Sequence, residues 1–343
     1  MIAKVVNLFS FTSRPKQTIQ DLERKILAFS GLELDRELFV YDVPIELQDK
    51  RYLIHTYRCG ETHNEDLVLL HGFAGSSVLY YPMLRELSNK YKVHCLDFIG
   101  MGLSSKEKFE CKTTEETLDF LVESIEKWRE AEGIEKFHLA GHSFGGYISG
   151  QYALRYPDRV TKISLMSPIG ITKHTEETTV EEIASRLSFF KKQMFLFVIN
   201  SWKKGVTPHS FIQDNPMIGK YLVGNYMTRL FKLEAEQGEP LKEFMIQMLS
   251  LPLGAEGAIH HILKPPRASA VLPLEEKIET MKMPVDCYYG QNDYMDSTGA
   301  QRVYERRRKS NFKLKLIPNA AHQLTMQNPI YLSHQLMGKI TID

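Results

Sequence analysis

Residues 136–156 read KFHLAGHSFGGYISGQYALRY, and the motif GHSFG at 141–145 stands in the middle of this stretch. The apolar run before the motif predicts a strand over Lys136–Gly141, and the pattern after it predicts a helix over Ser143–Tyr156. A G-x-S-x-G motif between a strand and a helix holds its serine at a sharp corner with the hydroxyl exposed. Glycines fit such a corner because they carry no Cβ, and the helix N-terminus faces developing negative charge. We therefore predict that Ser143 is a nucleophile.

A nucleophilic serine needs a base, and sites of this strand–turn–helix kind order their triad as serine, acid and histidine. Six of the twelve histidines follow Ser143, four of them within a long helical segment. His334 falls inside the last predicted helix. His322 follows the last predicted strand, Lys313–Ile317, in the sequence NAAH. Loops at the carboxyl ends of strands carry the reactive groups in such sheets, so we predict that His322 is the base.

The acid must orient this imidazole and stabilise its charged form. The strand Val285–Gly290 is followed by the sequence QND, which makes Asp293 the first choice. Asp296 is the alternative, although it could instead cap the following helix. The loop after the strand Lys162–Ser167 is another place for the acid, but its sequence SPIG holds no carboxylate.

Two backbone N–H groups must stabilise the oxyanion of an acyl-transfer reaction. Phe144 directly follows the nucleophile and is predicted to supply one of them. The loop after the strand Asp66–His71 reads HGFAG, and Phe73 is predicted to supply the other because the flanking glycines allow a close approach of the backbone. We expect His71 and His142 to support the structure rather than to react.

Strands and helices alternate along most of the chain. Eight strands are predicted, including a hairpin formed by Glu37–Val43 and Arg51–Tyr57. This alternation predicts an α/β fold with a mostly parallel eight-stranded sheet and helices on both faces. We assign residues 17–170 and 283–343 to this core, residues 171–282 to a helical lid insertion, and residues 1–16 to an N-terminal tail that could act as a targeting segment.

The composition of the 343-residue chain is that of an ordinary globular protein, with 43% hydrophobic and 25% charged residues. Its 43 basic and 42 acidic residues argue against a dedicated nucleic-acid-binding protein. The four cysteines form no C-x-x-C pair, and no histidine–carboxylate cluster has metal-site spacing, so no metal is expected. The glycine-rich loop DFIGMGLSS at 97–105 lacks the G-x-G-x-x-G pattern. We therefore expect no cofactor and predict that Asp97 braces a turn.

Two features bear on the cellular location. No run reaches 18 apolar residues, so no transmembrane helix is predicted. The first 20 residues contain basic but no acidic side chains, a pattern similar to an organelle presequence. We expect an intracellular protein, either cytoplasmic or at the periphery of a membrane or lipid droplet, with a mitochondrial destination left open.

The sequences HGFAG, DFIGMGLSS, GHSFGG, YGQND and NAAH occur in the order typical of α/β-hydrolases. The chain resembles this superfamily over roughly residues 17–340. The stretches LVESIEKWR at 121–129 and YGQNDYMDSTG at 289–299 resemble one lipid-active subfamily. It includes the N-acylphosphatidylethanolamine lysophospholipase, the cardiolipin-specific deacylase and the lipid-droplet coactivator of triglyceride lipase. The resemblance implies the α/β-hydrolase fold and a lipid acyl-ester substrate.

Three positions relate the chain to this subfamily in more detail. The coactivator has asparagine at the position of Ser143, so the resemblance implies that this chain is catalytically competent. The subfamily often carries an aspartate five positions after its histidine, a pattern proposed for acyl transfer to lysophosphatidic acid. Gln327 stands there in this chain, which weakens the case for acyl transfer through that motif. In some relatives the acid aligns with Asp296, so the choice between Asp293 and Asp296 stays open.

We therefore expect a serine hydrolase that cleaves acyl esters of phospholipids or lysophospholipids through an acyl-enzyme. One alternative is a hydrolase of small esters, amides or peptides similar to prolyl aminopeptidases, in which lid carboxylates capture a substrate ammonium. Glu181, Glu182 and Glu234 are the candidates for that role. The other alternative is a lysophospholipid acyltransferase or a lipid-droplet protein that regulates another lipase.

The lid stretch at 187–204 reads LSFFKKQMFLFVINSWKK. Large apolar side chains with a lysine pair near each end are typical of a helix that lies in a membrane interface. The stretch equally suits a lid helix packed over an acyl pocket. We expect it either to contact a membrane or lipid droplet or to cover the pocket, and the sequence does not identify any protein partner.

Overall fold

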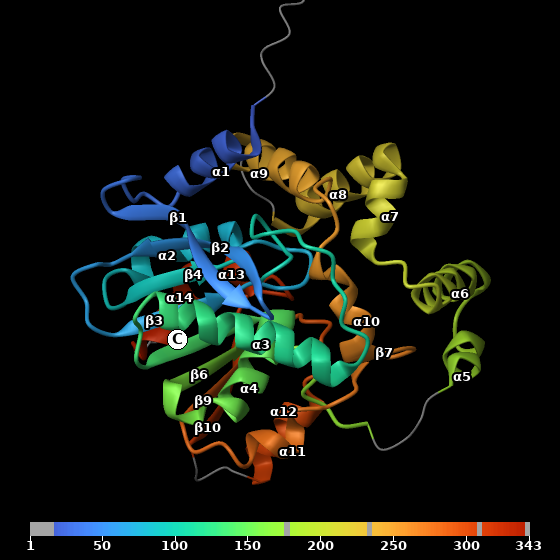
Figure 1. Ribbon diagram of the computed structural model, residues 1–343. Coiled ribbons are helices and arrows are strands. Elements are labelled where there is room, and N and C mark those ends of the chain that lie inside the picture. Colours follow the sequence, from blue (N-terminus) through green and yellow to red (C-terminus); the bar gives the residue numbers. More distant parts are fainter. Residues whose placement is uncertain (1–16, 175–178, 232–234, 307–310, 340–343) are drawn as a thin grey trace, which may run out of the picture.

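The computed structural model describes residues 17–174, 179–231, 235–306 and 311–339. A single large sheet runs through the centre of the molecule (Figure 1), in the strand order β1-β2-β4-β3-β5-β6-β9-β10. The strands are β1 (Leu38–Leu47), β2 (Lys50–Cys59), β3 (Asp66–Leu70), β4 (Lys92–Leu96), β5 (Phe137–His142), β6 (Val160–Met166), β9 (Val285–Gly290) and β10 (Phe312–Ile317). Strand β2 is antiparallel to β1 and β4, and the remaining neighbours are parallel. The predicted mostly parallel eight-stranded sheet is confirmed.

Burial explains why the central strands read as continuous apolar runs. In β3, Val68 and Leu70 join one hydrophobic cluster and Leu67 and Leu69 join another, so both faces of the sheet are covered. The first cluster contains residues of α3 (Thr114–Ala131) and α4 (Phe144–Arg155), which lie in front of the sheet in Figure 1. The second contains residues of α1 (Ile19–Ala28), α2 (Tyr81–Leu87) and α14 (Pro329–Met337).

The β1–β2 hairpin is longer than predicted, since its strands meet at a two-residue turn. Gln48 and Asp49 form this turn with φ angles of 52° and 58°. Two consecutive residues of positive φ match the twist of paired strands and allow a tight hairpin. Pro44 lies within β1 opposite Leu53, and its missing N–H is tolerated because β1 is an edge strand.

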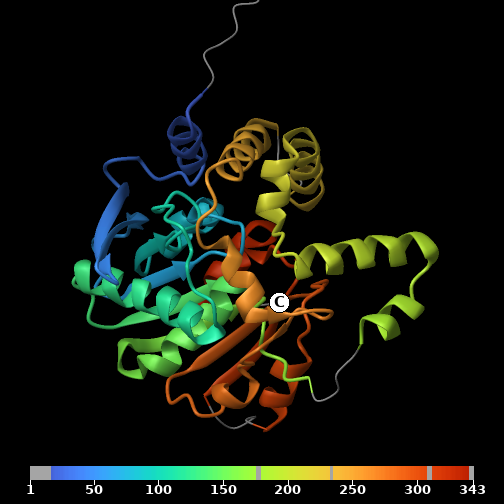
Figure 2. The same cartoon turned by 45° about the vertical axis from the view of Figure 1, so that its right-hand side comes forward.

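Between β6 and β9 the chain leaves the sheet and forms a mainly helical insertion. Its helices are α5 (Val180–Ser185), α6 (Phe189–Lys203), α7 (Pro208–Asp214), α8 (Pro216–Phe231), α9 (Ala235–Met248), α10 (Ala258–Ile262) and α11 (Glu275–Ile278). A short ribbon pairs β7 (Leu263–Lys264) with β8 (Ser269–Ala270). Helix α9 packs against α1, whereas α6 extends from the molecule away from the sheet (Figure 2).

Two expectations concern segments that could target or anchor the chain. The predicted N-terminal tail, residues 1–16, lies outside the described residues. Within the described ranges, none of the helices is both long and apolar enough to cross a membrane.

Candidate active site

Ser143 occupies the corner between β5 and α4. Its φ of 54° and ψ of −113° are strained for a residue with a side chain, and such strain is common at functional positions. A Cβ at Gly141 would lie 2.2 Å from the carbonyl oxygen of Gly145, and a Cβ at Gly145 would lie 2.3 Å from that of Leu70. Both positions of the G-x-S-x-G motif therefore require glycine, because the backbone of the turn comes close to itself at Gly141 and to the end of β3 at Gly145.

His322 brings an imidazole to this serine from the loop that follows β10. The distance from His322 Nε2 to Ser143 Oγ is 3.1 Å, and both residues are buried. This is hydrogen-bond distance, so Nε2 can accept the hydroxyl proton as a general base. The structure thus brings together the two residues that the sequence predicted as nucleophile and base.

Asp293 contacts the other side of the imidazole, with 3.3 Å between Asp293 Oδ1 and His322 Nδ1. The carboxylate also accepts hydrogen bonds from the Met295 amide at 3.0 Å, the Gly290 amide at 3.3 Å and the Ser167 hydroxyl. Burial favours a higher pKa for Asp293, but the hydrogen bonds from His322, Ser167 and Met295 outweigh it and hold the pKa below its ordinary value. The group is therefore charged at neutral pH.

Asp296, the alternative acid, serves another part of the fold. Its Oδ1 accepts hydrogen bonds from the Thr298 amide at 3.0 Å and the Thr298 hydroxyl at 2.6 Å, where α12 (Thr298–Arg306) begins. Its Oδ2 lies 3.6 Å from His174 Nε2. These contacts fit the helix-capping role that sequence analysis weighed against catalysis, and Asp293 is the carboxylate that contacts His322.

The predicted oxyanion donors lie on the two segments that flank Ser143. A Cβ at Gly72 would lie 3.3 Å from the Ser143 Cβ, so the loop after β3 runs directly past the serine. Phe73 follows in this loop, and its ring packs edge-on against that of Phe144 with 6.0 Å between centroids. Phe144 begins α4, and amides in the first turn of a helix have no intrahelical partner. Both segments thus lie beside Ser143, and the role of the Phe73 and Phe144 amides as oxyanion donors stays a prediction.

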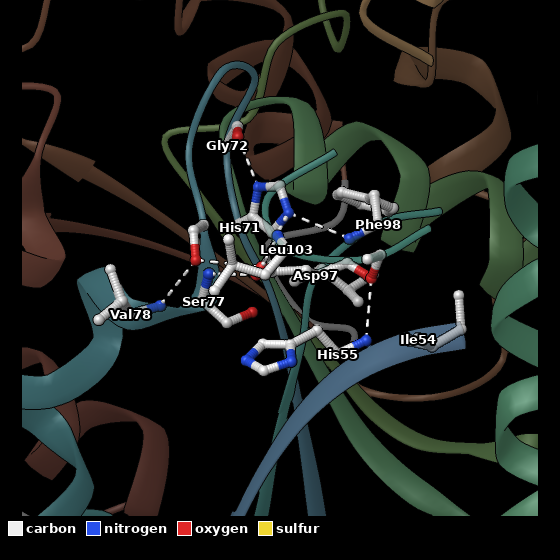
Figure 3. Close-up of polar contacts among 12 residues, drawn as sticks. Ile54, His55, His71, Gly72, Ser77, Val78, Asp97, Phe98 and Leu103 are labelled. Carbon is white, nitrogen blue, oxygen red and sulfur yellow. Dashed lines mark hydrogen bonds and ion pairs between the residues drawn. The ribbon is translucent and has the colours of Figure 1, made fainter. Parts of the chain in front are cut away.

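A buried polar cluster holds this loop in place (Figure 3). Both nitrogens of the His71 ring have partners. Nδ1 lies 2.8 Å from the Gly72 carbonyl oxygen, and the Phe98 amide donates to Nε2 at 3.1 Å. Burial lowers the pKa of His71, so the neutral ring donates from Nδ1 and accepts at Nε2. This residue therefore supports the loop, as predicted, rather than contacting the serine.

Asp97 holds the same cluster from the end of β4. Its fully buried carboxylate accepts hydrogen bonds from the Ser77 amide at 2.6 Å and the Leu103 amide at 2.7 Å (Figure 3). A Cβ at Gly102, whose φ is +55°, would lie 2.0 Å from an Asp97 oxygen, which explains why this loop is rich in glycine. The predicted turn-bracing role of Asp97 agrees with these contacts.

Three groups outside the triad position the acid and the base. A supporting role was expected for His142, whereas the roles of Gln327 and Ser167 were not foreseen from the sequence. His142 donates from Nε2 to the His322 carbonyl at 2.7 Å, and burial together with the nearby His322 lowers the pKa of His142 to about 3. Gln327 Oε1 accepts the Ala321 amide at 2.7 Å. Ser167 donates to Asp293 from a backbone with φ of 45°. These roles depend on contacts between distant segments, so no local pattern in the sequence indicates them.

Two tyrosines stand near His322 at the surface. The ring of Tyr294, which is 72% exposed, lies 4.6 Å from the His322 ring between centroids. The hydroxyl oxygen of Tyr226 in α8 accepts a hydrogen bond from Gln323 Nε2 at 3.4 Å. The insertion therefore reaches the residue next to the predicted base.

The lid carboxylates proposed for an ammonium-binding site are placed differently. Glu182 is exposed and closes the capping box of α5 by accepting the Thr179 amide at 2.9 Å. Glu181 is exposed in the same turn, and Figure 1 shows α5 at the edge of the molecule. Glu234 lies outside the described residues. The described contacts give no support to an ammonium-binding site.

Comparison with known proteins places these features in context. The family model described as "alpha/beta hydrolase fold" matches residues 67–329. A probable 1-acylglycerol-3-phosphate O-acyltransferase of Oryza sativa subsp. japonica is 28% identical over 78% of this chain and 65% of its own length. The (lyso)-N-acylphosphatidylethanolamine lipase of Bos taurus is 26% identical over 91% of this chain and 85% of its own. The chain spans less than two thirds of the rice protein, and it spans 63% of a similar acyltransferase of Arabidopsis thaliana.

Solved structures agree on the fold. The carboxylesterase CesB of Bacillus subtilis superposes with a TM-score of 0.60 at 19% identity, covering 93% of this chain and 96% of its own. A bacterial membrane phospholipase A superposes with a TM-score of 0.65 at 18% identity, covering 93% and 89%. At these identities the likeness concerns the arrangement of strands and helices alone.

Proposed function

Because the chain belongs to the α/β-hydrolase family, we propose that it is a serine hydrolase that cleaves acyl ester bonds of phospholipids or lysophospholipids. The observation that carries this proposal is the continuous contact from Ser143 through His322 to Asp293. A buried carboxylate that orients an imidazole, which in turn contacts a serine hydroxyl, is the arrangement that activates a serine.

In the proposed reaction, Ser143 Oγ attacks the ester carbonyl and its proton passes to His322 Nε2. Asp293 fixes the tautomer of the imidazole and stabilises its charged form. The Phe73 and Phe144 amides bind the oxyanion of the tetrahedral intermediate. When the intermediate collapses, the leaving alcohol takes the proton from His322. Water then gives a proton to His322 and attacks the acyl-enzyme, and the fatty acid is released as Ser143 regains its proton.

The lipid nature of the substrate is supported by the relatives. The bovine relative is named a lipase of N-acylated phosphatidylethanolamine, and the rice relative is named an acyltransferase of an acylglycerol phosphate. Both names describe acyl groups on a phosphate-bearing glycerol backbone. We infer the same substrate class for this chain.

Acyl transfer is the second candidate, because relatives that bear this activity in their names resemble the chain as well as the lipases do. It would use the same acyl-enzyme with a lysophospholipid hydroxyl in place of water. Gln327, at the position of the proposed transfer aspartate, accepts the Ala321 amide and so supports the His322 loop. We therefore favour water as the acyl acceptor.

The test is mass spectrometry of a mixed phospholipid and lysophospholipid extract incubated with the purified protein or with its Ser143→Ala variant. Serine-dependent release of fatty acid is expected, and the species consumed identify the headgroup. Serine-dependent gain of a second acyl chain by lysophospholipids would instead identify a transferase.

Labelling of Ser143 by a fluorophosphonate provides the control for competence. Labelling without any serine-dependent change in lipids would contradict the lipid substrate and favour a small ester or peptide. A folded protein that is not labelled would contradict the serine mechanism itself and favour a regulator of another lipase.

A further inference from the structure

The helical insertion exposes far more apolar side chain than the rest of the described surface. In α6, Phe190 is 84% exposed and Phe189 is 70% exposed, and in α8 Met217 is 87% exposed. The other large apolar side chains exposed on these two helices are Met194, Phe197, Val198, Ile218, Tyr221, Leu222 and Tyr226. This many exposed large apolar side chains on two helices of one insertion indicates a binding role rather than ordinary solvent exposure.

The two helices that carry these side chains are also basic, although the whole chain has a formal net charge of only +1. Residues 187–213 include four lysines and neither aspartate nor glutamate. All four, Lys191, Lys192, Lys203 and Lys204, are exposed. Helix α8 likewise contains Lys220 and no acidic residue. Apolar and basic side chains without acidic ones complement a surface that is apolar inside and negatively charged outside.

Contacts within the insertion connect this surface to the candidate active site. The Trp202 ring near the end of α6 packs 4.4 Å from His260 between centroids, while the Phe197 and Phe211 rings lie 6.4 Å apart and join α6 to α7. Helix α8 then carries Tyr226 to the residue beside His322. A lipid drawn from a surface bound at α6 and α8 would therefore enter close to the serine.

We propose that α6 and α8 form the surface with which the protein docks on an anionic phospholipid bilayer. The exposed rings and methionines enter the boundary between headgroups and acyl chains, and the lysines bind lipid phosphates. The two helices combine exposed apolar side chains with lysines, which are the two features of an interfacial helix. A surface for a protein partner would be expected to contain acidic as well as basic side chains. Docking itself does not depend on the proposed function. The proposed function is needed only for the further statement that the bilayer supplies the lipid substrate.

The first test measures binding of the Ser143→Ala variant to phosphatidylcholine vesicles with and without phosphatidylglycerol. Binding that requires phosphatidylglycerol is expected. The double variant Lys203→Glu/Lys204→Glu should weaken it at least about tenfold, since each basic residue near an anionic surface contributes roughly a fivefold factor. The matched control is Lys136→Glu/Lys282→Glu, which makes the same change in net charge.

The control residues suit this purpose because both are exposed and precede parallel strands, at the edge of the sheet opposite Ser143. Binding of the control double variant should equal that of the parent. Equal weakening by both pairs would show a response to net charge alone and would overturn the proposed surface.

A second test addresses the apolar half of the surface. Phe190→Ser/Met194→Ser should weaken vesicle binding about tenfold or more, because the parent side chains leave water on docking. Leu316→Ser serves as the control, since Leu316 is 60% exposed on the edge strand β10. All these side chains are exposed, so the melting temperatures of the variants should match the parent, which confirms that they fold.

Hydrolysis of a soluble short-chain ester separates failure of docking from failure of the proposed function. Surface variants should keep this activity and lose activity on vesicles. Vesicle binding without any Ser143-dependent hydrolysis would sink the proposed function and leave the docking surface intact. A parent protein that hydrolyses soluble esters but does not bind anionic vesicles would overturn the docking surface and leave the hydrolase, with the apolar patch then assigned to a protein partner.

Discussion

The carboxyl edge of the sheet buries polar side chains, whereas the helical insertion exposes apolar ones. At the sheet edge, Ser143, His322 and Asp97 are buried, and each has specific hydrogen-bond partners. In the insertion, Phe189, Phe190, Phe197 and the lysines of α6 are exposed. Burial with satisfied hydrogen bonds fixes groups that must hold one geometry, whereas exposed apolar surface remains available for a partner.

This contrast separates chemistry from recognition. Reacting groups lose catalytic efficiency when they shift by a fraction of an ångström, so they sit on a packed sheet and are held by groups such as His142 and Asp97. Recognition of a lipid surface tolerates movement. We therefore expect changes at the sheet edge to alter turnover of every ester, and changes in α6 to alter only turnover on lipid surfaces.

The largest effect on kcat should come from replacing Asp293, and Asp296 provides the comparison. Asp293→Asn should lower kcat on a soluble ester about 10⁴-fold, because the imidazole loses the carboxylate that sets its tautomer and stabilises its charge. Asp296→Asn, the matched control, should change kcat less than about threefold, because Asp296 contacts Thr298 and not His322. Steady-state kinetics measure both. If Asp296→Asn proved the more damaging change, the acid would be reassigned.

The next effect concerns the junction between the two regions. Glu256 follows α9 and is buried, with contacts to Lys106 Nζ at 2.9 Å, His209 Nδ1 at 3.1 Å and the Gly254 amide at 2.6 Å. Burial favours a higher pKa for Glu256, but the hydrogen bond from His209 and the charge of Lys106 outweigh it and lower the pKa to about 2. This carboxylate therefore ties α7 of the insertion to the loop after β4.

Glu256→Gln should lower the free energy of unfolding at pH 7 by about 3 kcal/mol, because it leaves the partly buried Lys106 without its countercharge. A lowered pKa stabilises the fold above the ordinary value near 4.5, and this gain disappears as the pH falls toward 2. The deficit of the variant should vanish over the same range. Urea unfolding at several pH values measures this deficit. The control is Glu239→Gln, since Glu239 forms an exposed pair with Lys242, and it should lower the free energy of unfolding by less than about 1 kcal/mol. A pH-independent deficit would argue against the ion pair.

Much of the sheet could be predicted because burial on both faces leaves a direct trace in the sequence. The runs at β3, β5 and β9 are apolar and short, and helical periodicity separates them. The ends of the hairpin could not be predicted, since Pro44 and the charged residues around the turn suggest a longer loop. Two residues of positive φ close that turn instead, a feature that depends on strand twist.

The candidate site was predictable where a residue type and its place after a strand are informative together, as for Ser143 and His322. The sequence made Asp293 the first choice for the acid but left Asp296 open, because both lie on one loop and only its path decides which of them faces the imidazole. Ser167 was noted only for the lack of a carboxylate beside it. Its strained backbone and its hydrogen bond to Asp293 arise from the pairing of β6 with β9.

The smallest effect on kcat is expected from removing one serine hydroxyl in each region. This pair of variants also gives the most direct comparison of the two regions. Ser167→Ala removes a donor to Asp293, so the carboxylate is held less firmly against His322 and kcat at pH 7 should fall about tenfold. Ser185→Ala removes a hydroxyl that donates to the Glu182 carbonyl in exposed α5, and should leave kcat unchanged.

A double-mutant cycle distinguishes positioning of Asp293 from loss of packing. If Ser167 acts only through the Asp293 carboxylate, adding Ser167→Ala to the Asp293→Asn variant should change kcat on a soluble ester little further. A damaged fold would lower kcat by the same factor in both backgrounds, so equal factors would assign Ser167 to packing alone. A loss confined to the protein that keeps Asp293 would mean that the buried edge positions its acid through a residue outside the triad.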